Sequence, residues 1–512
     1  MGTVMSNLSK SDQPVQLEPD PQRWKALIFI AIAQLMVVLD ATVVNIALPH
    51  AQVDLHISDA NRQWVITAYS LAFGGLLLFG GRISDLWGRK RTFILGLVGF
   101  AAASALGGAA VNEGMLLGAR ALQGVFGALL APAALSLLAV TFTEAKERAA
   151  AFGIFGAIAG AGGAVGLILG GVLTQYANWR WALFVNIFFA IIAAIGAVLF
   201  IHEREEGRNR DRLDIPGVLL ATTGLVALVY GFTKASTPGD GWGAPITIGM
   251  FIASAVLLAA FVLVESKVKA PLLPLRVILN RNRGGVYLSL GLAIIGMFGL
   301  FLFLTYYLQQ VKGYTPVMTG VAFLPMIGGM IAGSTQIGAR LMNRVPARLL
   351  MGPGFLVAAV GMLFLTQLSV GSSYAAVLLP GFLLLGLGMG TAFMPAMSLA
   401  TYKVQPRDSG VASAMINTSQ QIGGSIGTAL LSTIAVNATS SYIKSHGAGN
   451  PALLAQAQVH GYVAAIWVAV GILVIAAGLT FALVNAGRDA VAPPTGGAGE
   501  EIGEASIPVI AH

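Results

Sequence analysis

The chain has 512 residues, of which 56% are hydrophobic and only 10% are charged, and its mean hydropathy is +0.79. Soluble globular domains carry roughly 25% charged residues, so this composition excludes a water-soluble domain and predicts a protein that lies in lipid. The absence of cysteine excludes disulfides, thiolate nucleophiles and cysteine-ligated zinc or iron–sulfur centres. The formal net charge of +8 does not indicate nucleic-acid binding, because the basic residues lie in short clusters between apolar runs.

The first apolar stretch follows a polar N-terminal segment, residues 1–20. It is too long for the apolar part of a secretory signal peptide, and no small-residue cleavage site follows it. We therefore expect a retained first span. This first span and the later apolar runs are long enough to cross a hydrocarbon core of about 30 Å, so the sequence predicts an all-α integral membrane protein. Its 14 transmembrane helices are expected near residues 26–48, 63–81, 92–111, 115–140, 149–174, 181–201, 213–233, 245–264, 285–308, 316–339, 349–368, 374–401, 409–436 and 461–485.

The basic residues indicate which side of the membrane each loop faces. An even number of spans places both termini on one side, and cytoplasmic loops are enriched in lysine and arginine. Of the 30 lysines and arginines, the loops opposite the termini hold only Arg62, Arg180, Lys234, Lys312 and Lys444. We therefore predict a multi-pass protein of the cell membrane with both termini in the cytoplasm. The longest outer loop, roughly residues 437–460, is too small for a catalytic domain, so we do not expect an enzyme.

Two charged segments divide the predicted spans into groups of six, two and six. The linker from His202 to Asp214 follows the sixth span, and a basic segment, 267–283, precedes the last six. The C-terminal residues are rich in proline, glycine and alanine, a composition typical of disorder. In chain order we expect a cytoplasmic N-terminal tail (1–25), an N-terminal six-helix bundle (26–201), the charged linker with two inserted transmembrane helices (202–283), a C-terminal six-helix bundle (284–487) and a disordered cytoplasmic tail (488–512).

Two charged residues, Asp40 and Arg120, lie well inside the predicted spans. A charge at the centre of a span costs at least about 2.5 to 3.5 kcal/mol on insertion scales, so it indicates a functional site. Counted from the outer ends of their helices at about 1.5 Å per residue, the two residues lie at similar depths. We therefore expect them to share one cavity. A purely structural ion pair between the first and fourth helices is the alternative reading.

The segment from Gly81 to Arg91 reads GRISDLWGRKR and lies in the predicted cytoplasmic loop between the second and third spans. A loop that only followed the enrichment of cytoplasmic basic residues would not need the acidic Asp85 between two glycines. The segment resembles motif A, the G-x-L-x-D-R-x-G-R-K signature of the major facilitator superfamily. The resemblance implies charge contacts that lock the cytoplasmic gate while the transporter opens outward. The residues of this gate motif are Gly81, Asp85, Gly88, Arg89 and Lys90.

Further segments resemble the fourteen-helix drug:proton antiporters of that superfamily. Residues 39–49 (LDATVVNIALP) are similar to the first-helix motif, and residues 117–124 (LGARALQG) to motif B, whose arginine is associated with proton coupling. Residues 306–316 and 417–424 also resemble this branch, so the resemblance covers the chain from 24 to 485. In the fifth span, the glycine spacing of motif C, the antiporter motif, is matched by Gly153, Gly162, Gly166, Gly170 and Gly171.

The antiporter motif has one departure, Leu167, where the family pattern has proline. Proline would bend the helix by removing an i to i−4 hydrogen bond, so the sequence does not predict the kink that the family pattern implies. The glycines have an alternative reading, because small residues let membrane helices approach closely, and the chain contains 64 glycines.

Polar and aromatic residues in several spans are candidates for the substrate cavity. For each of them alone, helix packing or a place in the interfacial belt is the alternative. The histidines lie in loops or tails, so we expect no metal site in the membrane. No GxxxxGK[ST] phosphate loop is present and we expect no cofactor. The candidate cavity residues are Gln34, Asn45, Tyr69, Tyr306, Tyr307, Gln309, Phe393, Met394, Asn417, Gln420 and Gln421.

The resemblance implies a major facilitator fold, in which two six-helix bundles enclose a central cavity and work by alternating access. It implies export of amphipathic, often cationic, drugs or antibiotics in exchange for protons, with membrane lipid as the surroundings and no nucleic-acid partner. Asp40 is then the expected proton-coupling carboxylate, tuned by Arg120. The alternatives are an exporter of a single metabolite or lipid, or a proton-coupled nutrient importer, of the same fold. A membrane enzyme or sensor is a more distant alternative, disfavoured by the short loops.

Overall fold

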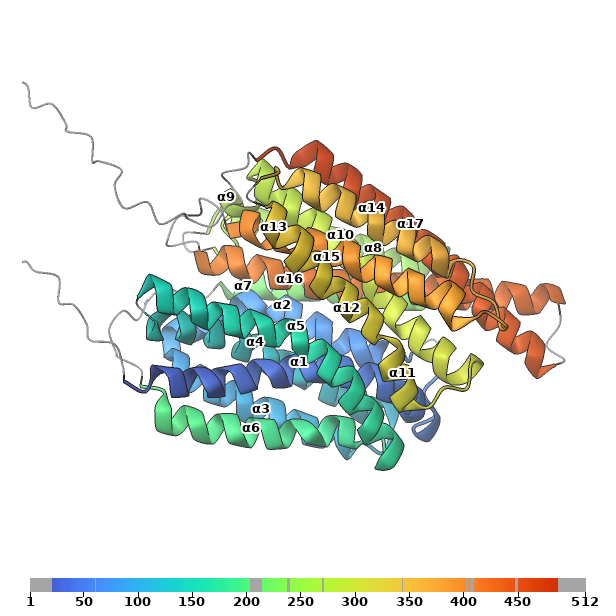
Figure 1. Cartoon of the computed structure of the whole chain (residues 1–512), viewed down its shortest axis with the longest axis horizontal. Helices are drawn as coiled ribbons and strands as arrows, with labels where there is room; N and C mark the ends of the chain where they lie inside the picture. The colour runs from blue at the N-terminus through green and yellow to red at the C-terminus, as the bar shows by residue number, and fades with distance from the viewer. Residues whose placement is uncertain are drawn as a thin grey trace, which may run out of the picture.

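A computed structural model describes residues 21–486, apart from positions 60, 143, 203–213, 237–239, 269–270, 343, 402–403, 405–408 and 447–449. The regular structure of the described residues is helical, and α1 begins at the end of the molecule where α17 finishes (Figure 1). We call this end the terminal face and the other end the opposite face. Residues 1–20 and 488–512 of the predicted tails and most of the predicted linker lie outside the described residues.

The N-terminal bundle consists of long helices that form because each apolar run must pair its backbone groups internally in lipid. Local signals set some of the ends: Asn112 accepts a hydrogen bond from the amide of Met115 (2.9 Å) and so begins α4. α1 packs against α5 and α6, and α4 packs against α2 and α3. The helices are α1 (Arg23–Asp54), α2 (Trp64–Trp87), α3 (Arg89–Gly108), α4 (Glu113–Thr141), α5 (Ala145–Tyr176) and α6 (Trp181–Phe200).

The C-terminal bundle follows the short helix α9 (Leu275–Ile278). Some of its spans are composite, because π-helical turns interrupt the regular α-helix. The first span joins α10 (Arg281–Tyr306) to η1 (Tyr307–Val311). The second span is made of four pieces: α11 (Pro316–Ala322), α12 (Leu324–Ala332), η2 (Gly333–Gly338) and α13 (Ala339–Leu341). The later spans are α14 (Arg348–Leu365), η3 (Tyr374–Leu378) joined to α15 (Leu379–Thr401), α16 (Ser409–His446) and α17 (Pro451–Leu483).

Two helices between the bundles in sequence, α7 (Ile215–Ser236) and α8 (Pro245–Glu265), pack against each other as a hairpin. α7 contacts both bundles. Gln63, next to α2, donates a hydrogen bond to Thr233 (3.3 Å), and Thr433 of α16 donates one to the carbonyl of Phe232 (2.7 Å). Only 11% of the apolar stretch of α8 is buried, so most of that helix faces lipid.

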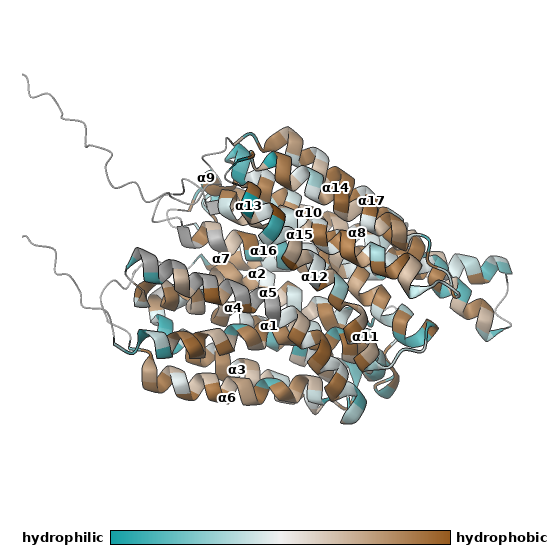
Figure 2. Cartoon of the chain, in the orientation of Figure 1, coloured by the Kyte–Doolittle hydropathy of each residue, from teal (hydrophilic) through white to brown (hydrophobic). Residues whose placement is uncertain are grey.

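The predicted membrane architecture is confirmed. Among the described residues, 13 helical segments are long and apolar enough to cross a membrane. The remaining predicted span is α5, a helix of 32 residues whose described apolar part is Gly162–Tyr176. Apolar residues cover the middle of the helices, and hydrophilic residues gather at the two ends (Figure 2).

The predicted outer loop at 437–460 was wrong, because helix occupies most of it. α16 continues to His446 and α17 begins at Pro451, after Asn450 accepts a hydrogen bond from the amide of Ala452 (3.0 Å). Ring contacts hold the two helices together beyond the apolar region, with Tyr442 lying 5.0 Å from His460, measured between ring centroids. Hydropathy marks only the part of a helix that lies in lipid, so it did not detect these polar extensions.

The sidedness of the protein is testable with reporter fusions. Fusions after Gly207 and Arg283 are expected to report the cytoplasm, and fusions near Asp240 and Gly447 the outside, because lysine and arginine concentrate on the first side. Paired reporters that are active on only one side of the membrane provide the measurement. If Gly207 and Arg283 reported opposite sides, the two inserted helices could not both be spans.

Candidate functional site

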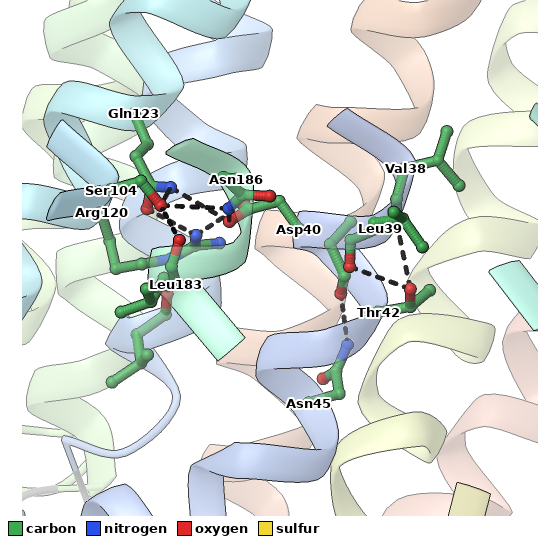
Figure 3. Close-up of polar contacts among 12 residues, drawn as sticks. Val38, Leu39, Asp40, Thr42, Asn45, Ser104, Arg120, Gln123, Leu183 and Asn186 are labelled. Atoms are coloured by element: carbon green, nitrogen blue, oxygen red, sulfur yellow. Dashed lines mark hydrogen bonds and ion pairs between the residues drawn. The ribbon is translucent and has the colours of Figure 1, made fainter. Parts of the chain in front are cut away.

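Asp40 lies at the centre of a polar network inside the N-terminal bundle and is fully buried (Figure 3). Its Oδ2 lies 2.7 Å from Nη1 of Arg120, which reaches it from α4. Its Oδ1 accepts hydrogen bonds from the side-chain amides of Gln123 (3.0 Å) and Asn186 (2.8 Å). Each hydrogen-bond partner of the carboxylate among the described residues is a donor, so both oxygens of Asp40 accept hydrogen bonds in this conformation.

A second set of hydrogen bonds fixes these donors in place. Ser104 of α3 accepts from Gln123 (2.9 Å) and from Asn186 (3.0 Å), and it donates to the carbonyl of Leu183 (2.7 Å). Arg120 also donates from Nη1 to Gln123 (2.7 Å) and from Nε to the carbonyl of Val65 (3.0 Å). The network therefore joins α1, α2, α3, α4 and α6 and orients each side chain around one carboxylate.

A cavity lies beside this network, between the two bundles. Its volume is about 110 Å³, and Arg120, which is 1% exposed, forms part of its wall. The Arg120 guanidinium lies 4.5 Å from the ring centroid of Tyr69, which also lines the cavity. Drug-sized ligands occupy pockets of about 300–1,000 Å³, so the bundles must move apart at this level to hold one. The remaining lining residues are Ala41, Val44, Ile66, Ser70, Phe298, Asn417, Gln420 and Gln421.

The structure brings together some of the predicted cavity residues and separates the others. Tyr69, Asn417, Gln420 and Gln421 line the cavity from α2 and α16. Asn45 instead donates to the carbonyl of Ala41 on its own helix (2.7 Å), and Tyr307 donates to the carbonyl of Ser369 within the C-terminal bundle (2.7 Å). Gln34, Phe393 and Met394 do not line the cavity either; the first two are half-buried and Met394 is exposed.

The remaining predicted residues, Tyr306 and Gln309, connect the bundles near the opposite face. The Arg62 guanidinium lies 4.1 Å from the ring centroid of Tyr306, and Gln309 donates to the carbonyl of Ile46 (3.0 Å). Further along, the amide of Val317 donates to Gln175 of α5 (3.3 Å). These contacts join α1, the loop after it and α5 to α10, η1 and α11. The bundles are therefore closed against each other between the Arg120 cavity and the opposite face.

The sequence matches the model of the Major Facilitator Superfamily over residues 30–428. The chain belongs to this superfamily. The puromycin resistance protein of Streptomyces alboniger is 52% identical over 491 residues, covering 96% of this chain and 95% of that protein. The cephamycin export protein of Amycolatopsis lactamdurans is 37% identical over 432 residues, covering 84% and 87%. The lincomycin resistance protein of Streptomyces lincolnensis is 35% identical over 419 residues, covering 80% and 84%.

Solved structures of the superfamily share the fold. A bacterial homologue of the human lysosomal transporter Spinster, in an inward-facing and occupied conformation, aligns with a TM-score of 0.65 at 18% identity and covers 93% of this chain and 99% of that one. An autoinhibited peptide transporter of the POT family gives a TM-score of 0.63 at 15% identity, covering 90% and 96%. The predicted major facilitator fold is thus confirmed, and the chain is a multi-span membrane transport protein of a superfamily of transporters, with close relatives in antibiotic resistance and export.

Four glycines of the antiporter motif occupy crowded positions on α5. A Cβ atom on Gly162 would meet Val38 of α1 at 3.0 Å, and one on Gly170 would meet the Cα of Val43 at 2.9 Å. A Cβ on Gly166 would lie still closer to the Thr42 side chain, and a Cβ on Gly171 would lie 2.7 Å from the carbonyl oxygen of Pro316 in α11. These superfamily glycines therefore let α5 approach both α1 and the other bundle.

The rest of the motif gives less contact detail. Gly153 lies in α5, but its surroundings are outside the described residues. α5 is one continuous α-helix, and the buried Leu167 occupies the position of the family's proline. The carbonyl of Leu167 lies directly against Gly320 of α11, so this stretch of α5 also packs closely on the C-terminal bundle.

The superfamily gate motif forms the turn between α2 and α3 at the terminal face. Gly88 has a φ of 103°, a conformation that suits glycine, and it ends α2 just before α3 begins. Gly81 is half-buried on α2, Lys90 donates to the carbonyl of Val198 (3.0 Å), and Arg89 is half-buried at the start of α3. Asp85 lies on α2, and its side chain is outside the described residues. The proposed locking role of this motif therefore stays a prediction.

Sequence reasoning missed three members of the Asp40 network: Ser104, Gln123 and Asn186. Gln123 lies within the segment that resembles motif B, three residues after Arg120 and so on the same helix face. Asn186 carries an amide side chain within an otherwise apolar span, and a polar residue in such a position usually has a hydrogen-bond partner on another helix. Ser104 gave no such signal, because serine is common wherever membrane helices pack closely.

Proposed function

We propose that the chain exports amphipathic, cationic antibiotics from the cytoplasm in exchange for protons, with its terminal face in the cytoplasm. Puromycin, a nucleoside with a free amino group, is the first candidate substrate, because the relative that is 52% identical over nearly the whole chain is named for puromycin resistance. The observation that carries the proposal is the buried ion pair between Asp40 and Arg120. Arg120 forms part of the wall of a cavity lined by both bundles, and the carboxylate of Asp40 lies behind it.

The geometry suggests that Asp40 acts through Arg120 rather than by contact with the substrate. Arg120 lines the cavity, whereas Asp40 lies behind it and is fully buried. When Asp40 is charged, it neutralises the guanidinium. A proton on Asp40 would remove that neutralisation and leave a positive charge at the cavity wall, which repels a bound cation. Proton uptake from outside would therefore favour drug release, and proton loss to the cytoplasm would restore a site that accepts the next cation.

Alternating access would couple this switch to the two faces of the protein. We propose that the contacts of Arg62 and Gln309 close the outer side, and that the gate motif of Gly81, Asp85, Gly88, Arg89 and Lys90 closes the cytoplasmic side when the outer side opens. A few charge-assisted hydrogen bonds suffice for such a switch. When the free energies of two states differ by only a few kcal/mol, gaining or losing these bonds reverses which state is more populated.

A second candidate is the exporter of a single organic anion. The charged group on the cavity wall is a cation, Arg120, and one relative is named for export of cephamycin, a carboxylic acid. In that case protonation of Asp40 would strengthen substrate binding instead of weakening it. The two candidates therefore predict opposite effects of protonation on affinity.

The test is transport driven by a pH gradient in proteoliposomes, with puromycin, a panel of cationic dyes and a cephamycin as substrates. The wild type is expected to move the cations against the proton flow. Arg120→Ala should reduce this transport at least about tenfold, equivalent to about 1.4 kcal/mol, because Asp40 loses its partner. Arg120→Lys should retain part of it, since the charge remains but the guanidinium's several simultaneous hydrogen bonds are lost.

The controls distinguish coupling from binding. Substrate binding by Arg120→Ala, measured without a gradient, should change less than transport. Movement of the cephamycin alone would favour the anion exporter. If a proton gradient moved none of these substrates through the wild type in either direction, proton antiport of antibiotics would be rejected.

A further inference from the structure

Two buried carboxyl groups lie at the terminal face of the α7–α8 hairpin, far in sequence from Asp40. Asp214 immediately precedes α7 and Glu265 is the last residue of α8; they are 5% and 3% exposed. Acidic side chains are almost never fully buried unless they are paired. The pair therefore needs an explanation that the central cavity does not supply.

Each carboxyl group uses one oxygen to hold backbone. Oδ1 of Asp214 accepts from the amide of Gly217 (2.9 Å) and caps α7, and Oε2 of Glu265 accepts from the amide of Leu273 (3.0 Å). The second oxygens, Oδ2 and Oε1, are buried and receive no donor from the described residues. Both lie over Gly217, at 2.6 and 2.8 Å from the position of a Cβ atom there, so the two free oxygens converge on one point.

Among the described residues, no cation donates a hydrogen bond to the free oxygens of the pair. Arg82 of α2 is the cation that acts on Glu265, but its Nη2 donates to the carbonyl of Pro271 (3.1 Å). Lys267, beyond the end of α8, has an exposed side chain. Two ionised carboxylates facing each other in a buried position repel strongly, and a single proton shared between them removes the repulsion and satisfies both free oxygens.

We propose that Asp214 and Glu265 form a proton-binding site, separate from Asp40, that holds one proton between Oδ2 and Oε1 and is in equilibrium with the cytoplasmic solution. The site lies outside the central cavity and is made by the inserted hairpin. It goes beyond the proposed antiport, because its occupancy can be measured without substrate and without transport.

The contacts around the pair connect this proton to the gate region. Glu265 holds Leu273, and Arg82, which lies in the gate-motif segment, holds Pro271. The held segment, 271–273, leads through α9 into α10 of the C-terminal bundle. When the pH rises and the shared proton leaves, repulsion separates the start of α7 from the end of α8. The 271–273 segment then loosens from α2, so the site makes this corner sensitive to cytoplasmic pH.

The first test detects the proton itself. Infrared difference spectra of the purified full-length protein, taken from about pH 5 to about pH 9 to cover a buried carboxyl group, should show a protonated carboxyl band of this pair that disappears as the pH rises. The Asp214→Asn and Glu265→Gln variants should each lose this band. Both variants keep the oxygen that accepts from backbone, and their amide N–H replaces the shared proton. The control is Glu144→Gln, an exposed acidic residue near the start of α5, which should leave the band unchanged.

The second test measures the position of the loop. The chain has no cysteine, so spin labels attached at Trp87→Cys and Val268→Cys, both on exposed positions, report the distance between α2 and the segment after α8. The population with the short distance should fall at least twofold between low and high pH in the wild type. It should stay constant in Asp214→Asn and Glu265→Gln.

Two results would overturn the proposal. One is a carboxyl band and a distance change that persist unaltered in both variants, which would place the titrating group elsewhere. The other is a distance that responds to added Na⁺ or Mg²⁺ at constant pH but not to pH, which would assign the pair to a metal cation. Neither result depends on whether the protein exports antibiotics.

Discussion

Asp40→Asn is expected to abolish proton-driven export, with a loss of at least about 100-fold, equivalent to about 2.7 kcal/mol. The asparagine has nearly the same shape as the aspartate but cannot gain or lose a proton. Arg120 would then lack a counter-charge in every state, and the cavity wall would stay positive. The decisive measurement is substrate-induced proton release from the purified protein in detergent, which should disappear in the variant.

A loss of folding could imitate this result. Removing one partner of a buried ion pair costs about 3–5 kcal/mol when the other charge stays unpaired, although Arg120 keeps its bonds to Val65 and Gln123. The control is the double variant Asp40→Asn with Arg120→Gln, which removes both charges. We expect it to recover the thermal stability of the wild type while remaining uncoupled. If Asp40→Asn released protons as the wild type does, the coupling carboxylate would lie elsewhere.

Gly171→Val is expected to prevent closure of the opposite face, which we propose is the outer side. A Cβ atom at this position would lie 2.7 Å from both the carbonyl oxygen of Pro316 and the Cα of Val317. Both are backbone atoms that cannot rotate away, so α5 and α11 must separate. The variant should bind substrate but transport it at least about tenfold more slowly, a change of about 1.4 kcal/mol, because it remains in conformations that are open to the outside.

Distance measurements can follow this separation directly. Spin labels at Tyr176→Cys and Met318→Cys occupy exposed positions on α5 and α11. The distance between them should lengthen in Gly171→Val relative to a parent protein that carries only the labels. The matched control is Gly163→Val on the same helix, where a Cβ atom would meet only Ile327 at 3.8 Å. An unchanged distance together with normal transport would show that the glycine is not needed for closure.

The sequence predicted the spans well because hydropathy reports directly on burial in lipid. The same signal explains its main error. The polar turns of α16 and α17 around Tyr442 and His460 lie beyond the apolar region, where helix is maintained by packing between two neighbouring helices. Pairing of this kind depends on tertiary structure, and a hydropathy profile contains no information on it.

The site was predictable only in part. Depth in the membrane placed Asp40 and Arg120 at one level, and their ion pair agrees with that reasoning, while their roles in coupling stay a prediction. Rotation about the helix axis was not available from the sequence. Tyr306 and Tyr307 are adjacent, yet one lies under Arg62 and the other bonds Ser369, and neither lines the cavity. Gln420 and Gln421 line the cavity because α16 faces it along this stretch, while their contact with a substrate stays a prediction.

The position of α7 makes the two sides of the transporter unequal for molecules dissolved in the bilayer. α7 lies over the line where α2 meets α16, and Thr233 and the carbonyl of Phe232 accept hydrogen bonds from the two sides of that line. On the other side, α5 meets α11 and α12, and no described helix covers that contact. A lipophilic molecule that approaches laterally from a membrane leaflet therefore meets α7 on one flank and the close contact of α5 with α11 on the other, so lateral entry between the bundles requires that α5 and α11 separate.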